Sequence, residues 1–269
     1  MKNRMLNAAI GACIIASVAQ AVPTWPVSWT AVTVGGNNYV DPHYDEVPGD
    51  NRVTPPNDRT DLIGGTDHHG NTFGTAYYAN DGVNLMFRVR ITGDPTQGSS
   101  PYAWTAILNT DLTSTKAEYG MQLDLSSADN QVELVACDPA LPGGPDNNWN
   151  VTYLGTPHTG AQESSATAKT DWYRFVNATT EDGSHFHSGS PDDDFFVDFA
   201  FDLDDVYAIT GLSDLDQLQV AFSTSTSHTS TLKDIPEAGW SDTITVPEPT
   251  AMALLALGVT VLAMRRRKV

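Results

Sequence analysis

Between residues 22 and 246, hydrophobic and polar residues alternate in short runs with a period of two. The clearest run is VNLMFRVRI at residues 83–91, where Leu85 and Phe87 fall on one face and Arg88 and Arg90 on the other. This pattern predicts a strand with one buried face and one face in water. The preceding Asn80-Asp81-Gly82 follows another β-rich run, so the two runs predict a β-hairpin.

The same alternation recurs along the rest of the body. Further strands are predicted at 102–108, 119–125, 132–135, 150–154, 172–176, 195–201, 218–222 and 243–246, with short helical turns at 203–209 and 212–217. Stretches rich in Pro, Gly, Asp, Asn, Ser and Thr predict loops at 42–72, 138–148 and 156–169. Many short strands with polar turns predict an all-β fold, a two-sheet antiparallel β-sandwich of jelly-roll or immunoglobulin-like type.

The N-terminus has the pattern of a signal peptide. Lys2 and Arg4 precede an apolar segment, and Ala19-Gln20-Ala21 fits the small-x-small cleavage rule. We therefore predict cleavage after Ala21. In the alternative, Ile10-Gly11-Ala12-Cys13 resembles a lipobox, which implies lipidation of Cys13; the apolar run before Cys13 is short for that purpose.

The C-terminus has three parts in order. Pro247-Glu248-Pro249 holds the chain extended, and the apolar run 251–264 follows it. This run is shorter than the roughly 20 residues that span a bilayer comfortably. The closing basic cluster stays on the cytoplasmic side of a membrane, and it consists of Arg265, Arg266, Arg267 and Lys268. A polar motif before a short hydrophobic tail is how cleavable sorting signals are built, so we predict a short transmembrane helix that anchors the precursor transiently.

This order resembles the PEP-CTERM signal of Gram-negative bacteria over residues 246–268. The resemblance implies that Pro247-Glu248-Pro249 is the recognition motif for an exosortase, a membrane transpeptidase-like enzyme. It also implies an exported protein of the cell envelope, cell surface or extracellular matrix. The alternative, an ordinary single-pass tail anchor, fits the prolines less well. The predicted organisation is a signal peptide at 1–21, a sandwich at 22–245 and a sorting signal at 246–269.

The charge is unevenly distributed along the 269 residues, which carry a formal net charge of −19. Six of the fourteen Lys and Arg lie at the two ends, and of the thirty-three acids only Glu248 lies outside 22–246. The body therefore has eight bases and thirty-two acids, a net charge of −24. Such a surface repels nucleic acid and anionic lipid and suits divalent cations.

The body also resembles DOMON-like and family-9-like carbohydrate-binding sandwiches. The segments are DGVNLMFRVRI, AWTAILNTD, EYGMQLDL and DDDFFVDFAFDL, and the similarity lies in strand order and alternation across 75–222. The resemblance implies a β-sandwich. It implies sugar or haem as ligand only where binding residues match, and no Met/His pair is placed for haem.

Three residues beyond a predicted strand are candidates for a calcium site. Asn109 and Asp111 alternate past the strand, and Glu118 opens the next one. Calcium prefers oxygen ligands of this kind. The twelve-residue calcium-loop pattern is not met, so a simple polar turn is the alternative.

Other polar clusters are likewise either metal ligands or solvated surface residues. The run Asp192-Asp193-Asp194 suits calcium or a solvated sheet edge. Asp67-His68-His69 and His185-Phe186-His187 suit Zn²⁺ or Cu²⁺, or are exposed loop histidines.

We find no sequence motif of a known catalytic class and predict that the protein is not an enzyme. Aromatic residues near loops and strand ends would make a sugar-stacking platform or else cap the sandwich; they are Trp25, Trp29, Tyr44, Trp149, Trp172 and Trp240. The leading prediction is a structural or adhesive surface domain. The alternative is a carbohydrate-binding module stabilised by calcium, and a weaker one is a secreted polysaccharide hydrolase.

Overall fold

The structure is a computed structural model. It describes residues 23–41, 61–67, 69–96, 102–113, 117–125, 131–136, 152–159, 172–184, 186, 194–225 and 239–244. The predicted signal peptide and the sorting signal lie outside these residues. Within them, no helix is long and apolar enough to cross a membrane.

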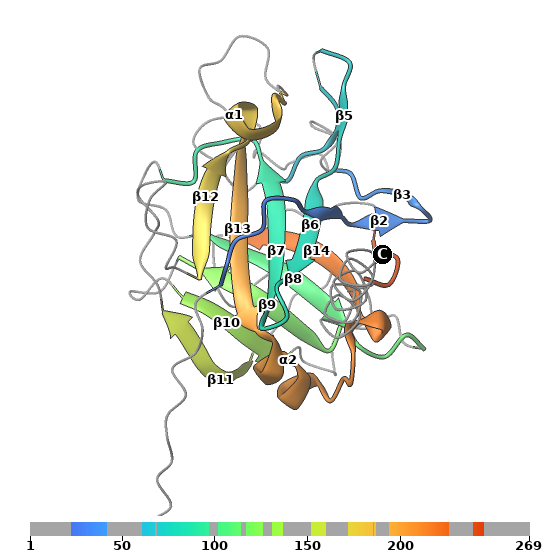
Figure 1. The fold of residues 1–269 in the computed structure, drawn as a ribbon, viewed down its shortest axis with the longest axis vertical. Coiled ribbons are helices and arrows are strands. Elements are labelled where there is room, and N and C mark those ends of the chain that lie inside the picture. Colours follow the sequence, from blue (N-terminus) through green and yellow to red (C-terminus); the bar gives the residue numbers. More distant parts are fainter. Residues whose placement is uncertain are drawn as a thin grey trace, which may run out of the picture.

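Two five-stranded antiparallel sheets form the fold (Figure 1). The first sheet has the order β1 (Thr30–Ala31), β6 (Ala76–Asn80), β7 (Asn84–Ile91), β13 (Phe195–Asp202) and β12 (Tyr173–Asn177). The second has the order β11 (Thr152–Thr159), β10 (Gln131–Ala136), β9 (Tyr119–Asp124), β8 (Ala103–Asn109) and β14 (Gln219–Ser225). The predicted two-sheet antiparallel sandwich is confirmed.

Smaller elements decorate the two sheets. They are the hairpins β2 (Thr33–Val34) with β3 (Asn37–Asn38) and β4 (Gly65–Thr66) with β5 (Thr72–Phe73), the helices α1 (Ala178–Asp182) and α2 (Leu203–Thr210), and the 3-10 turn Leu215–Gln217. Figure 1 shows α1 and α2 at opposite ends of β13.

Aromatic side chains join the two sheets through the core. Phe87 of β7 lies 6.2 Å from Phe199 of β13 and 5.7 Å from Phe222 of β14, measured between ring centroids. All three rings are completely buried. Since β14 belongs to the other sheet, the edge-to-face contact of Phe87 with Phe222 packs the two sheets against each other.

The prediction that the second face of β7 is wet was wrong. Arg88 and Arg90 point away from the core, yet their exposed fractions are 3% and 0%. Side chains from the N-terminal segment, α1 and β13 cover them, and carboxylates compensate their charges. Charged residues at alternate positions therefore did not identify a solvent face.

The polar face of β9 is buried too. Gln122 pairs with Thr105 of β8 on one side and with Glu133 of β10 on the other, and none of the three is exposed by more than 2%. Gln122 Nε2 donates a hydrogen bond to Thr105 Oγ1 over 2.9 Å. Burial, with a smaller contribution from Asp124, raises the pKa of Glu133 to about 7.

Other elements also differ from the prediction. The strands β1, β2 and β3 were not predicted, and the β4–β5 hairpin lies in and beside the predicted loop at 42–72. Strand β11 continues to Thr159, into the predicted loop at 156–169. Helix α1 was not predicted. The predicted closing strand at 243–246 is not a regular strand in its described residues Thr243 and Ile244, although the Ile244 amide donates to Leu218 O.

Candidate binding pocket on the outer face of the first sheet

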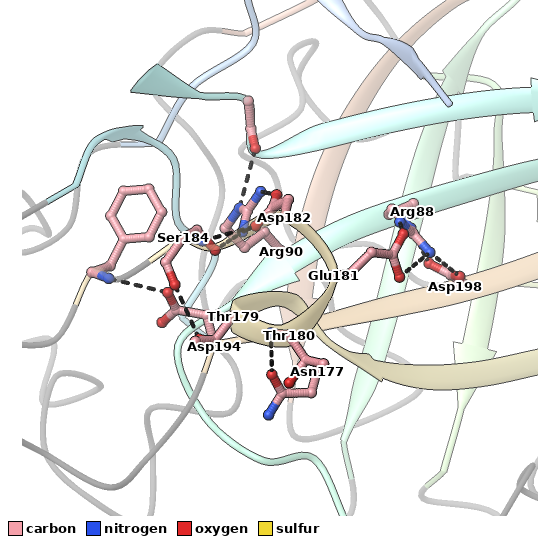
Figure 2. A network of polar contacts seen from close by, with 12 residues as sticks. Arg88, Arg90, Asn177, Thr179, Thr180, Glu181, Asp182, Ser184, Asp194 and Asp198 are labelled. Atoms are coloured by element: carbon pink, nitrogen blue, oxygen red, sulfur yellow. Dashed lines mark hydrogen bonds and ion pairs between the residues drawn. The ribbon is translucent and has the colours of Figure 1, made fainter. Parts of the chain in front are cut away.

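A buried ion pair joins β7 and β13 at the centre of this face. Arg88 and Asp198 are directly opposite in the strand register. Arg88 Nε lies 2.6 Å from Asp198 Oδ1, and Nη2 lies 2.7 Å from Oδ2 (Figure 2). This two-pronged geometry matches the planar guanidinium to the planar carboxylate. It satisfies the charge of a carboxylate that is completely buried.

Two further charges complete this pair. Arg174 Nε of β12 lies 2.7 Å from Asp198 Oδ2, so one carboxylate accepts from two arginines. Glu181 of α1 forms an ion pair with Arg88 Nη1. Burial disfavours the charged form of Arg88, but the carboxylates of Asp198 and Glu181 outweigh it and raise the pKa of Arg88 above its ordinary value.

The second outward arginine of β7 has its own partners. Arg90 Nη2 lies 2.6 Å from Asp182 Oδ2, Nη1 donates to Ser184 Oγ, and Nε donates to Gly74 O over 3.4 Å. Figure 2 shows Glu181 and Asp182 reaching Arg88 and Arg90 from the same helix. Consecutive residues of α1 therefore serve two arginines that are two positions apart on one strand.

The sequence around α1 explains why these carboxylates are in place. Asn177 caps the helix start, accepting from the Thr180 amide over 2.8 Å. Gly183 ends it with φ of +77°, a conformation that favours glycine. A helix of five residues depends on such caps, because it has few internal hydrogen bonds.

Aromatic rings lie against the guanidinium groups. The Arg88 Cζ atom is 4.5 Å from the Trp29 ring centroid and 4.3 Å from that of Phe196. Phe196 also lies 4.4 Å from Arg90 Cζ, and the Trp25 ring lies 4.9 Å from Arg174 Cζ. Cation–π contacts of this kind add stabilisation where the charge is desolvated.

A pocket of about 350 Å³ opens above these groups. This volume lies in the lower part of the range for small-molecule sites, roughly 300–1,000 Å³. The side chains of Glu181 and Asp182 are 38% and 28% exposed, so they present polar atoms to it. The lining residues are Val27, Ser28, Trp29, Tyr77, Arg88, Glu181, Asp182 and Phe196.

The charged side chains that line the pocket are paired with one another or with neighbouring groups. Glu181 and Asp182 are each paired with an arginine. Glu133, whose pKa burial raises to about 7, lies on the second sheet and does not line the pocket. The pocket thus offers an indole face, hydroxyls and paired charges as contacts.

The predicted calcium residues come together in one turn after β8. The Asp111 amide donates to Asn109 Oδ1 over 3.1 Å, and the Thr110 amide donates to Glu118 Oε2 over 2.9 Å. Hydrogen bonds from Thr113 lower the pKa of Asp111, whereas burial raises that of Glu118. Their oxygens accept hydrogen bonds within the turn, and calcium binding here stays a prediction.

The other predicted clusters are only partly described. Asp192, Asp193, His68, His185 and His187 lie outside the described residues. Buried Asp194 accepts a hydrogen bond from the Phe186 amide over 3.1 Å. In the part of the chain that the structure describes, no three His, Cys, Asp or Glu side chains are grouped to hold a metal ion.

The predicted aromatic platform is not seen among its described members. Trp25 and Trp172 are 3% and 7% exposed, and Trp29 and Trp240 are half-buried. Tyr44 and Trp149 lie outside the described residues. The four described tryptophans therefore contribute mainly to packing, with Trp29 also lining the pocket.

Sequence reasoning missed the arginine network. The body has only eight basic residues, and Arg88, Arg90 and Arg174 make up three of them. In so acidic a chain, the small number of cations already indicates that they form ion pairs, because many carboxylates compete for each of them. An Arg-x-Arg pair inside a predicted strand was the local sign.

The fold is an all-β sandwich with a pocket on the outer face of its first sheet. Residues 245–268 match the PEP-CTERM protein-sorting motif, in agreement with the predicted signal at 246–268. The chain is thus an exported protein, transiently anchored in the membrane and processed at the cell envelope by an exosortase, a membrane enzyme. No curated protein and no solved structure matches the chain. The similarity to DOMON-like and family-9-like sandwiches stays a prediction.

Proposed function

We propose that the sandwich is a non-catalytic structural or adhesive domain. In this proposal a Gram-negative-type bacterium displays it at the cell surface or in the extracellular polysaccharide matrix. The observation that carries the proposal is the network of Arg88, Arg90 and Arg174 with Asp198, Glu181 and Asp182. Each cation is compensated within the chain, so the network braces the sheet instead of leaving a charged group for chemistry.

The rigidity of this face supports a load-bearing role. Ion pairs join β7 to β13 and α1, and a further ion pair joins β13 to β12. Phe196 contacts both outward arginines of β7. Removing one partner of an ion pair would leave the other as an uncompensated buried charge. A domain held in this way suits permanent exposure outside the cell.

The test compares cells that lack the protein with cells complemented by the wild type or by a sandwich-destabilised Asp198→Asn variant. The proposal expects a loss of cell attachment or matrix retention in the deletion, and recovery with the wild type only. Normal attachment of the deletion strain would contradict it. Release of soluble sugar from a polysaccharide by the purified wild type, abolished by Glu181→Gln with Asp182→Asn, would overturn the non-catalytic part.

A second candidate function is carbohydrate binding in the pocket. The observation that favours it is the combination of the Trp29 indole with the Tyr77 and Ser28 hydroxyls and two partly exposed carboxylates. Sugars present apolar ring faces and many hydroxyl groups, so an aromatic wall beside hydrogen-bond acceptors suits them.

Affinity electrophoresis on a panel of polysaccharides tests this candidate. Ser28→Arg places a bulky side chain at an exposed position that lines the pocket and should abolish retention. Thr30→Arg is the matched control, because Thr30 is exposed two residues away and does not line the pocket. Wild-type protein that no polysaccharide retains, or equal retention of the two variants, would exclude the pocket as a sugar site.

A further inference from the structure

The chain remains fastened to the sandwich up to the sorting motif. The segment Ser241–Ile244, here called the strap, follows β14 closely. The Ser241 amide donates to Val220 O over 2.8 Å, and the Ile244 amide donates to Leu218 O over 2.9 Å. Ser241 Oγ accepts from the Val220 amide over 2.9 Å. Ile244 is itself part of the hydrophobic core and is only 2% exposed.

The strap also holds the β2–β3 hairpin. Asp242 accepts hydrogen bonds from the Gly35 and Gly36 amides, both over 2.9 Å, and from Thr33 Oγ1 over 2.8 Å. Its own amide donates to Thr33 O over 2.6 Å. Gly35 and Gly36 have φ of +57° and +79°, the geometry of a tight hairpin turn that favours glycine. Strap and hairpin thus form one surface, the strap–hairpin surface (33–38 with 241–244).

The matched sorting motif begins at residue 245, the residue after Ile244. Pro247 follows Ile244 by three residues, a distance of at most about 11 Å for a fully extended chain. The apolar run begins at Ala251, so its start lies within about 25 Å of Ile244. An enzyme that binds Pro247-Glu248-Pro249 therefore approaches the strap–hairpin surface while the sandwich is folded.

The chemistry of this surface fits such an approach. Residues 33–38 read TVGGNN and carry no charge, within a body of net charge −24. Gly35, Gly36, Asn37 and Asn38 are exposed. The one carboxylate here, Asp242, is occupied by the three hydrogen bonds to the hairpin. The hairpin tip consequently offers polar, uncharged contacts beside the motif.

We propose that the strap–hairpin surface is a docking surface for the membrane processing enzyme, which contacts it while Pro247-Glu248-Pro249 occupies the active site. The enzyme thus reads the folded end of the sandwich as well as the linear motif. This inference rests on the sorting motif and is independent of what the sandwich does afterwards.

The experiment measures precursor processing over time in cells that contain the exosortase, by immunoblotting and intact mass. Asn37→Arg introduces charge and bulk at the hairpin tip and should slow processing about fivefold or more. Val83→Arg is the matched control, since Val83 is also exposed in a hairpin turn, between β6 and β7, and should leave the rate unchanged. Thermal melts establish that both variants fold.

A second arm separates docking from other causes. Ten Gly/Ser residues inserted between Ile244 and Thr245 move the surface away from the motif, so Asn37→Arg should have no effect in that background. Wild-type processing of Asn37→Arg without the insertion would overturn the proposal, as would a defect that persists with it. The insertion and Asp242→Ala are also tested as separate variants. If each is processed faster than the wild type, the strap must detach before cleavage, and this result also overturns docking.

Discussion

Arg88 of β7 and Asp198 of β13 face each other, and the Arg88 guanidinium donates two hydrogen bonds of 2.6 and 2.7 Å to the buried Asp198 carboxylate. Replacing Asp198 with Asn would leave two arginines facing a neutral amide. We expect a loss of about 3–5 kcal/mol in the free energy of unfolding. Urea denaturation measures it.

Asp204→Asn is the matched control for this substitution, because Asp204 is an exposed carboxylate in the first turn of α2. It should change stability by no more than about 0.5 kcal/mol. Replacing Arg88 and Asp198 together with Met and Leu should cost less than Asp198→Asn alone, because it does not leave the buried Arg88 charge without its partner. Equal losses for both would contradict the assigned origin of the effect.

The pKa of Glu133, raised to about 7, predicts a pH-dependent stability. Between the pKa of an unfolded glutamate, about 4.3, and about 7, the folded state binds more protons than the unfolded state. Stability should therefore fall as the pH rises through this window, by at most about 4 kcal/mol. Glu133→Gln removes the titration and should remove this slope. A variant that differs from the wild type equally at pH 4.5 and pH 8 would contradict the assignment.

Asp242 should show the opposite pH dependence. Its hydrogen bonds from Gly36, Thr33 and Gly35 lower its pKa. Its contribution is thus fully present above about pH 4, where a free aspartate ionises, and is lost as the pH falls below that. Asp242→Asn should lower the melting temperature at pH 7, and the difference from the wild type should vanish at about pH 2. A difference that persists at low pH would indicate a steric effect.

Calcium at the turn after β8 can be tested by melting the purified body in Ca²⁺ and in EDTA. A bound cation stabilises the folded state by mass action, so the melting temperature should be higher in Ca²⁺. Asp111→Asn removes an exposed carboxylate from the predicted ligand set of Asn109, Asp111 and Glu118. It should therefore abolish the difference in melting temperature. Equal melting temperatures in both buffers would exclude calcium here.

Replacing Pro247-Glu248-Pro249 with three alanines should leave an uncleaved, membrane-held precursor. The basis is the sorting motif at residues 245–268. Intact mass spectrometry of wild type and variant reads the C-terminal cleavage and, in the same spectrum, tests the predicted signal cleavage after Ala21. Unchanged maturation in a strain that has the enzyme would refute the role of the motif.

The sequence predicted the strands well because their apolar residues must meet in one core. The alternation in VNLMFRVRI placed Leu85 and Phe87 on the inner face of β7, where they lie. It also placed Arg88 and Arg90 on the outer face, but wrongly predicted that they are exposed to water. Periodicity shows which side chains share a face but not what covers that face. The covering groups are Trp29 and α1, which come from distant parts of the chain.

The pocket was unpredictable for the same reason. Trp29 and Glu181 approach Arg88 from segments that are separated from it by tens of residues. Helix α1 has capping residues at both ends, Asn177 and Gly183. Its five residues are too few to show a helical repeat of hydrophobic positions in the sequence. By contrast, the sorting motif is linear, so residues 246–268 were sufficient to recognise it.

The strap has a mechanical consequence. A pulling force on the chain beyond Ile244 enters the domain through Leu218, which precedes β14 of the second sheet. Through Asp242 it also reaches Thr33 and the turn at Gly35 and Gly36, just after β1 of the first sheet. Tension is therefore shared by both layers, and the domain resists being peeled open strand by strand from its tethered end.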